Sequence, residues 1–146
     1  MKIFKNLTGI LLVDDDIPTN FIHGKVIQKT GLAVKVKSVT NVTDASDFLM
    51  RKGKFENGED VFRPGIIFLD INMPGLTGWD FMDKYHRLDP VYKANIVVIM
   101  LTTSLNPADA ERAKKDKEIT SFLHKPLNPQ ILEELIAAHF EEDTGN

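Results

Sequence analysis

Hydrophobic residues gather in five short runs, which longer stretches of mixed character separate. The runs at 9–13, 66–71 and 96–101 are almost wholly apolar and rich in β-branched residues, as expected for strands covered on both faces. The run at 33–39 alternates valine with lysine and serine, which is typical of a strand at a sheet edge with one face in water. A shorter strand is predicted at 120–124.

Helical patterns fill the gaps between these strands. They are predicted at 17–29, 43–50, 78–88, 107–117 and 127–140. We expect Asp16 to cap the first and Thr43-Asp44 to cap the second, and the last shows an apolar stripe at Ile131, Leu132, Leu135, Ile136 and Phe140. Strands and helices that alternate in this way predict an α/β fold, with a parallel sheet, helices on both faces and right-handed crossovers.

Two segments break the alternation. Residues 51–65 combine glycine, proline and charges of both signs, so we expect a long surface loop, with Phe55 and Phe62 pinning it to the body. Residues 141–146 are polar and acidic, and we expect a frayed, solvated tail.

Composition narrows the class of protein. A chain of 146 residues fits one domain, which we expect to occupy 1–146 with its core at about 8–140 and no output domain. The net charge of −3 argues against a nucleic-acid binder, and the absence of cysteine removes disulfides and thiol chemistry. Residues 1–13 contain neither a signal peptide nor a membrane span, so a cytoplasmic protein with no membrane partner is expected.

Four of the predicted strands end in residues with charged or hydroxyl side chains: Asp14-Asp15, Asp70, Thr102 and Lys125. In a parallel sheet these endings share one edge, where ligands bind in open α/β sheets. Carboxylates that meet there repel one another unless some are protonated or a cation sits among them. Oxygen ligands favour a hard ion such as Mg²⁺, and a lysine and a hydroxyl beside it would complete a pocket for a dianionic group.

A carboxylate in such a pocket can act as a nucleophile towards phosphorus and form an aspartyl phosphate. Mg²⁺ and Lys125 would stabilise charge on the transferring oxygens, and Thr102 could donate a hydrogen bond to the phosphoryl group. The residues therefore predict an Mg²⁺-dependent phosphoryl acceptor at Asp70.

The motifs LLVDDD, IIFLDINMPGLTG, VIMLTTS and FLHKPLNP follow one another in this order. In them the chain resembles receiver domains of the two-component response-regulator family over roughly residues 8–140. The resemblance implies a flavodoxin-like (βα)5 three-layer sandwich with a parallel five-stranded sheet in the order 2-1-3-4-5.

The resemblance also implies the roles of the acidic residues. Asp70 would be the phosphorylated aspartate, and Asp15 would ligate Mg²⁺ directly. Asp14 would act mainly through a bound water, and the backbone carbonyl of Asn72 would supply a further ligand. The phosphodonor would be a histidine kinase or a histidine phosphotransfer protein.

The resemblance implies a second group of residues, which would change position on phosphorylation. Thr102 matches the switch hydroxyl, and Phe122 matches the aromatic residue that swings inward behind it. Lys125 matches the lysine that contacts the phosphoryl group, and the family usually holds the Lys125-Pro126 bond cis. Output would be non-covalent, through a partner protein, a relay step or a homodimer formed by the face at 107–140.

Two features depart from the common family pattern. Thr103 stands where many members carry a smaller residue, and it could slow both phosphotransfer and hydrolysis. The loop at 51–65 is longer than in compact members, as in a subset of single-domain receivers that resemble partners of phytochrome-type kinases.

Other functions and roles stay open. A phosphatase of the haloacid-dehalogenase type also uses a strand-end aspartate, but it needs a second carboxylate where this chain has Asn72. A pseudo-receiver would keep the fold without phosphorylation. We expect Trp79 to pack at a helix start, and side chains of Asn72 and Ser104 to tune phosphoryl lifetime. The four histidines are expected at the surface: His23, His86, His124 and His139.

Overall fold

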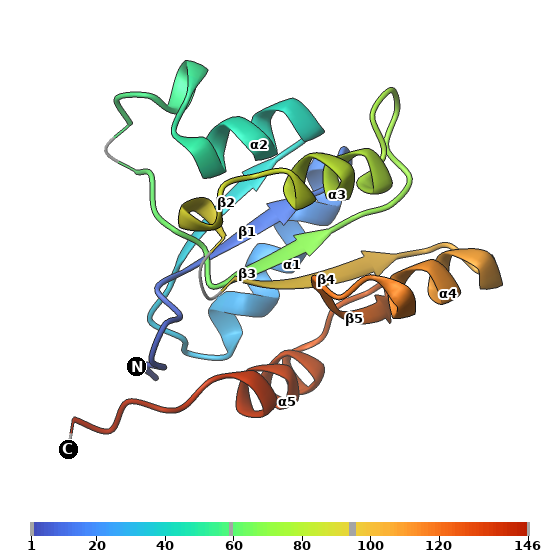
Figure 1. Cartoon of the computed structure of the whole chain (residues 1–146). Helices are drawn as coiled ribbons and strands as arrows, with labels where there is room; N and C mark the ends of the chain where they lie inside the picture. The colour runs from blue at the N-terminus through green and yellow to red at the C-terminus, as the bar shows by residue number, and fades with distance from the viewer. Residues whose placement is uncertain (1, 59, 94–95, 146) are drawn as a thin grey trace.

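A parallel five-stranded sheet in the order β2-β1-β3-β4-β5 forms the centre of the computed structural model, which describes residues 2–58, 60–93 and 96–145 (Figure 1). The strands are β1 (Gly9–Val13), β2 (Lys35–Val39), β3 (Ile66–Leu69), β4 (Val97–Thr102) and β5 (Ile119–His124). This order confirms the flavodoxin-like prediction and the edge position of β2. The expectations that touch Met1, Glu59 and Asn146 lie outside the described residues.

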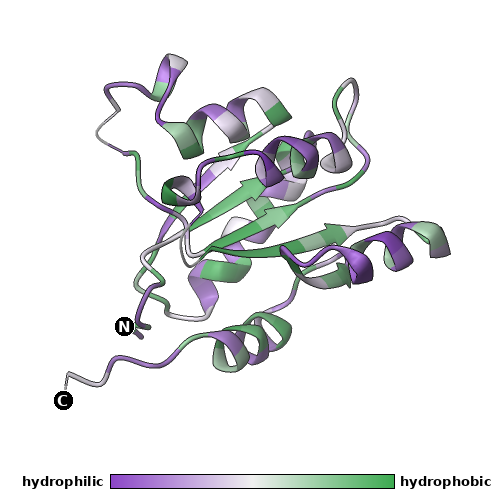
Figure 2. Ribbon diagram, in the orientation of Figure 1, coloured by the Kyte–Doolittle hydropathy of each residue, from purple (hydrophilic) through white to green (hydrophobic). Residues whose placement is uncertain are grey.

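Helices cover both faces of the sheet. They are α1 (Ile17–Lys29), α2 (Val42–Met50), α3 (Gly78–His86), α4 (Pro107–Lys115) and α5 (Pro129–His139). One apolar core joins the sheet to α1 and α5, and a second joins it to α2, α3 and Ala113 of α4. The central strands are accordingly the most hydrophobic part of the ribbon (Figure 2). In the part of the chain that the structure describes, no helix is long and apolar enough to cross a membrane.

The predicted ends of several elements needed correction. Asp16 caps α1 as expected, with its side chain accepting a hydrogen bond from the Thr19 amide at 3.1 Å. The cap expected at Thr43-Asp44 was wrong: Asn41 caps α2, and its Oδ1 accepts from the Asp44 amide at 2.8 Å. A cap satisfies an amide two or three residues further on, so it must stand before the first turn. Strand β3 stops at Leu69, which leaves Asp70 in the loop just beyond the sheet.

The loop at 51–65 is held to the body by aromatic packing, as predicted. It contains one 3₁₀ turn, η1 (Gly53–Phe55). The rings of Phe55 and Phe62 both meet Phe48 of α2 edge-on, with centroids 5.3 and 5.1 Å away. Phe62 also fills the space where Gly9 would carry a Cβ, which would lie 2.1 Å from the ring. Phe55 and Phe62 therefore extend the core beside β1 and α2, while most described residues of the loop stay exposed.

The tail expected to fray pairs with the start of the chain. The Lys5 amide donates to the Glu141 carbonyl, and the Asp143 amide donates to the Ile3 carbonyl, each at 2.8 Å. Phe4 packs against the α1/α5 core, so burial of this ring supports the pairing. The composition of the tail gave no sign of this, since most of the contacts are made by its backbone, with one exposed ion pair between Lys5 and Glu141 at 3.2 Å.

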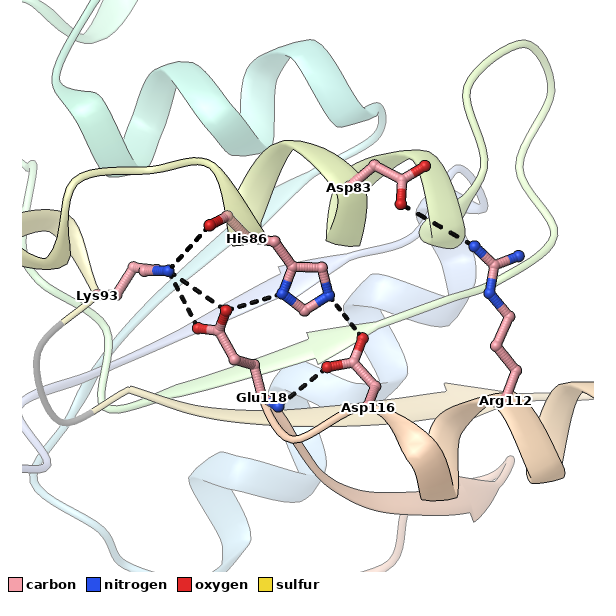
Figure 3. A network of polar contacts seen from close by, with 6 residues as sticks. All are labelled: Asp83, His86, Lys93, Arg112, Asp116 and Glu118. Atoms are coloured by element: carbon pink, nitrogen blue, oxygen red, sulfur yellow. Dashed lines mark hydrogen bonds and ion pairs between the residues drawn. The ribbon is translucent and has the colours of Figure 1, made fainter.

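A polar cluster joins the end of α3 to the segment between α4 and β5 (Figure 3). Its members are His86, Lys93, Asp116 and Glu118. The Nδ1 of His86 lies 2.7 Å from Glu118 Oε1, and its Nε2 lies 2.8 Å from Asp116 Oδ2. Lys93 pairs with Glu118 at 3.2 Å. Partial burial lowers the pKa of His86, but the hydrogen bonds and charges of Glu118 and Asp116 outweigh it and raise the pKa above its ordinary value. Burial raises the pKa of Glu118, but its hydrogen bonds to His86 and Lys93 leave it lowered.

The first prediction concerns how the stability that this polar cluster contributes depends on pH. Because the pKa of His86 is raised in the folded state, its stabilisation is complete below the ordinary value of 6.5 and is lost as the pH rises through the folded pKa. Glu118 behaves oppositely, since its stabilisation is lost as the pH falls through its lowered pKa. We expect His86→Gln to lower the free energy of unfolding by about 0.5 kcal/mol near pH 6, after solvent screening, and by less at pH 8.

Urea unfolding of both proteins from pH 5 to pH 8 measures this difference. His139→Gln, at the exposed end of α5, is the matched control and should show no such pH dependence. A loss of unfolding free energy in His86→Gln that stayed constant over this pH range would contradict an ionic role for His86 in the cluster.

Candidate functional site

Three carboxylates gather where β1 and β3 end. Asp14 and Asp15 follow β1, Asp70 follows β3, and these strands are direct neighbours in register, with Val13 opposite Leu69. One carboxylate oxygen from each of the three residues lies within 4.8 Å of the others. Asp14 and Asp70 are buried, with 4% and 5% of their surfaces exposed, whereas Asp15 is exposed. This acidic cluster fits the hard-cation site that the sequence predicted.

Lys125 supplies the positive charge at this edge. Its Nζ lies 2.5 Å from Asp14 Oδ2 and 3.4 Å from Asp70 Oδ1. The backbone sets this position, because the Lys125 amide donates to the Thr102 carbonyl at 2.9 Å and continues the pairing of β4 with β5. Burial lowers the pKa of Lys125, but contacts with Asp14 and Asp70 outweigh it and raise the pKa, so the group is an ammonium at neutral pH.

One ammonium does not neutralise three carboxylates. Burial raises the pKa of Asp70, and the charges of Asp14 and Asp15 act in the same direction, against Lys125, which lowers it. The net effect is a pKa above its ordinary value. Additional positive charge at this point would favour the ionised form of Asp70, and a divalent cation has the charge to supply it.

The remaining residues proposed from the sequence lie at the end of β4, in the loop after Asp70 and on β5. Thr102 ends β4, next to β3, and is fully buried, while its Oγ1 accepts from the Ser104 amide at 3.1 Å. Asn72 is exposed in the loop after Asp70. Phe122 lies partly buried on the edge strand β5, beside a groove with α4, and meets His124 edge-on at 5.8 Å. The bond between Lys125 and Pro126 is cis, as the resemblance implies.

Helix α1 adds two buried polar residues that the sequence analysis missed. Asn20 Nδ2 donates to the Asp14 carbonyl at 2.9 Å, and this fixes the turn between β1 and α1. His23 is only 3% exposed, so its predicted surface position was wrong. Burial lowers the pKa of its ring, as does the charge of Lys125. Asn20 and His23 share a helical stripe with the buried Ile27, and that spacing could have revealed them.

Gly78 brings α3 close to the loop that carries Asp70. A Cβ at this position would lie 2.4 Å from the carbonyl oxygen of Asp70 and 2.9 Å from the Cα of Ile71. The Gly78 amide donates to the Ile71 carbonyl at 2.9 Å. Only glycine lets the helix begin this near to Asp70, which explains the glycine that ends the motif around the strand.

Comparisons with known proteins agree with this geometry. Residues 10–137 match the response regulator receiver domain family. The chain is 32% identical over 119 residues to protein-glutamate methylesterase/protein-glutamine glutaminase 3 of Burkholderia thailandensis, a match that covers 80% of this chain and 29% of that protein. The chain thus spans under a third of the length of this curated relative.

Solved structures resemble the fold over almost its whole length. A two-component response regulator from Cytophaga hutchinsonii is 30% identical with a TM-score of 0.77, and the match covers 90% of this chain and 96% of that one. The bacteriophytochrome response regulator RtBRR is 26% identical with a TM-score of 0.74, covering 90% of this chain and 76% of that one. With the family match over residues 10–137 and an acidic cluster at the expected sheet edge, the chain belongs to the response regulator receiver domain family of two-component signalling.

Proposed function

We propose that this chain works as a receiver, which accepts a phosphoryl group on Asp70 with the help of Mg²⁺ and switches a protein-interaction surface. The observation that carries the proposal is the meeting of three carboxylate oxygens within 4.8 Å, with the Lys125 ammonium against two of these carboxylates. Without a bound cation this arrangement is electrostatically unfavourable, because buried like charges repel. It becomes useful when a cation and an anionic group bind there together.

The proposed transfer needs no acid or base from this chain. A carboxylate oxygen of Asp70 attacks the phosphorus of a phosphohistidine, a P–O bond forms, and the P–N bond breaks with its electron pair left on the donor imidazole. The ammonium of Lys125 already lies against Asp14 and Asp70, so it would be placed to contact the oxygens of a phosphoryl group on Asp70. Charge on the equatorial phosphoryl oxygens is what such a group stabilises.

The residues proposed to hold Mg²⁺ are Asp15, Asp70 and the backbone carbonyl of Asn72, with Asp14 acting through a water. This donor set is all oxygen, as Mg²⁺ prefers, and the exposed Asp15 and Asn72 leave a side for its water ligands. Asp14 suits an indirect role because its two oxygens already accept from the Asp16 amide and from Lys125. Bound there, Mg²⁺ would neutralise negative charge on the transferring group.

The switch would act through hydrogen bonds to the phosphoryl group. Phosphorylation adds about −1.5 to −2 charge and three acceptor oxygens, to which Thr102 and Lys125 would turn. Movement of Thr102 would vacate space that Phe122 can fill, and the face at 107–140 would change shape. Inverting a 1:99 equilibrium needs roughly 5.5 kcal/mol, which a few charge-assisted hydrogen bonds of roughly 1.5–3 kcal/mol each can supply.

The proposed phosphodonor is a histidine kinase or a histidine phosphotransfer protein, and the likeness to the bacteriophytochrome response regulator RtBRR makes a phytochrome-type kinase a candidate. The output is a protein contact or a homodimer through the same 107–140 face. A phosphatase of the haloacid-dehalogenase type is disfavoured by Asn72, whose amide cannot serve as the general acid.

Asp70→Asn tests the acceptor. We expect this variant to gain no mass with acetyl phosphate and Mg²⁺, while the wild type gains one phosphoryl group, as measured by intact-protein mass spectrometry. In Mg²⁺-free buffer at pH 7 the variant should be more stable by on the order of 1 kcal/mol, because one repelling charge leaves the cluster. Since the pKa of Asp70 is raised, this gain should shrink as the pH falls through it.

Asp47→Asn, in α2, is the control and should take up phosphate at the wild-type rate. Undiminished phosphate uptake by Asp70→Asn would rule out this acceptor. A wild type that neither gained mass nor bound beryllofluoride with Mg²⁺ would favour the pseudo-receiver.

Lys125→Ala tests the coupling of the site to the surface. We expect Mg²⁺ binding to survive, because lysine is not a ligand, and phosphorylation to leave amide hydrogen exchange over residues 105–140 unchanged. Without Mg²⁺ the variant should lose about 3 kcal/mol of stability, since Asp14 and Asp70 would be buried without their counter-ion. Lys114→Ala, exposed on α4, is the control. A wild-type exchange response in Lys125→Ala would refute the coupling.

A further inference from the structure

The loop between β4 and α4 is anchored by one serine side chain. Ser104 Oγ donates to Asp109 Oδ2 at 2.6 Å and accepts from the Asn106 amide at 3.2 Å, while the Ser104 amide donates to Thr102 Oγ1 at 3.1 Å. Apolar burial contributes little to holding this loop, because Leu105 at its tip is 86% exposed. The position of the Ser104 amide, and with it the contact to Thr102, therefore depends on these hydrogen bonds.

Asp109 carries the chain of contacts on to α3. Its second oxygen, Oδ1, accepts from the indole Nε1 of Trp79 at 3.0 Å. One carboxylate thus ties the loop after Thr102 to the first turn of α3, with a donor on each oxygen. Both bonds have an ionised acceptor, which makes them stronger than bonds between neutral groups.

Arg112 holds the indole in place from the other side. It lies one turn further along α4, and its guanidinium carbon is 4.4 Å from the centroid of the Trp79 ring, a cation–π contact. Its other partner is Asp83 of α3, 4.0 Å away (Figure 3). The expected role of Trp79 as plain packing was therefore incomplete, since the ring links α3 to α4.

The chain of contacts opposes movement of the switch hydroxyl. A hydroxyl has one hydrogen to donate, and Thr102 must carry that hydrogen towards Asp70 to reach a phosphoryl oxygen. If its oxygen moves, the Ser104 amide must either lose its acceptor or follow. Ser104 can follow only by stretching its 2.6 Å bond to Asp109, and a displaced Asp109 disturbs the indole of Trp79.

We propose that Asp109 is a positioning residue for the switch: it holds Ser104, and through it Thr102, in the unphosphorylated arrangement, and it passes the displacement of Thr102 to Trp79. The proposal rests on the proposed phosphorylation of Asp70. Asp109 touches no reacting atom, and its effect is confined to where the Ser104 amide and the indole lie.

The test uses Asp109→Asn and the full chain. Asparagine keeps the shape but offers one acceptor oxygen in place of two, so the Ser104 hydroxyl and the Trp79 indole can no longer both donate to residue 109. Beryllofluoride with Mg²⁺ serves as the phosphoryl probe, and its affinity is measured by titration together with the Mg²⁺ affinity alone. We expect beryllofluoride to bind about three- to tenfold more tightly to the variant, the value of one lost restraining hydrogen bond, with Mg²⁺ affinity unchanged within about twofold.

Fluorescence gives a second readout, because Trp79 is the single tryptophan of the chain. In the wild type, beryllofluoride with Mg²⁺ should shift the indole emission. In Asp109→Asn the emission should already be shifted before the probe is added, and the probe should change it little. A merely structural contact between α3 and α4 would alter thermal stability but would not separate beryllofluoride affinity from Mg²⁺ affinity.

Matched variants keep the test decisive. Glu111→Gln, exposed on the same helix, should match the wild type in both readouts. Ser104→Ala removes the upstream link and should also tighten beryllofluoride binding, while Ser104→Thr, which keeps a hydroxyl, should restore the wild-type value.

Two results would overturn the proposal. Wild-type beryllofluoride affinity in both Asp109→Asn and Ser104→Ala, with normal phosphate uptake, would remove the positioning role alone. Failure of the wild-type protein to gain mass with acetyl phosphate or to bind beryllofluoride would overturn the proposed function, and the positioning role with it.

Discussion

The contact between one ammonium and two buried carboxylates determines how this molecule is built. Lys125 lies 2.5 Å from Asp14 and 3.4 Å from Asp70, on a surface that would otherwise concentrate uncompensated negative charge. Each of the three residues follows a different strand, so the contact forms only because β1, β3 and β5 end at the same edge of the sheet. A buried pair of this kind stabilises little by itself, because desolvation offsets the attraction. Its importance is that it places a positive charge against two buried carboxylates that would otherwise only repel each other.

The rest of the fold makes that contact possible. Strands β1 and β3 are buried on both faces and carry no polar side chain, so polar residues can appear only where these two strands end. Gly78 lets α3 start against the Asp70 carbonyl, and Asn20 ties α1 to the Asp14 carbonyl. The two helices fix the backbone of both aspartates from opposite faces of the sheet. The site is therefore rigid beneath Asp14 and Asp70, and adaptable at the exposed Asp15 and Asn72.

The sequence predicted most of this framework and the acidic cluster. Fully apolar runs have one stable place, the middle of a parallel sheet, and that place determines where the following Asp70 must lie. Local patterns could not reveal contacts between segments far apart in the chain. The bond from Trp79 to Asp109 joins residues on different helices, and the pairing of the tail is made mainly by backbone groups that every sequence has. The burial of His23 becomes predictable only from its helical spacing with Asn20 and Ile27, because a single polar residue by itself favours the surface.

The pairing between residues 3–5 and 141–143 has a practical consequence for work with this protein. Both segments lie where the strands begin, opposite to the edge that carries Asp70 (Figure 1). A fluorescent reporter or an affinity handle fused beyond residue 145 would leave the molecule from that remote side, clear of any kinase docked over the aspartates. Deleting residues 141–143 would instead remove the backbone hydrogen-bond partners of Ile3 and Lys5 and expose Phe4 to water.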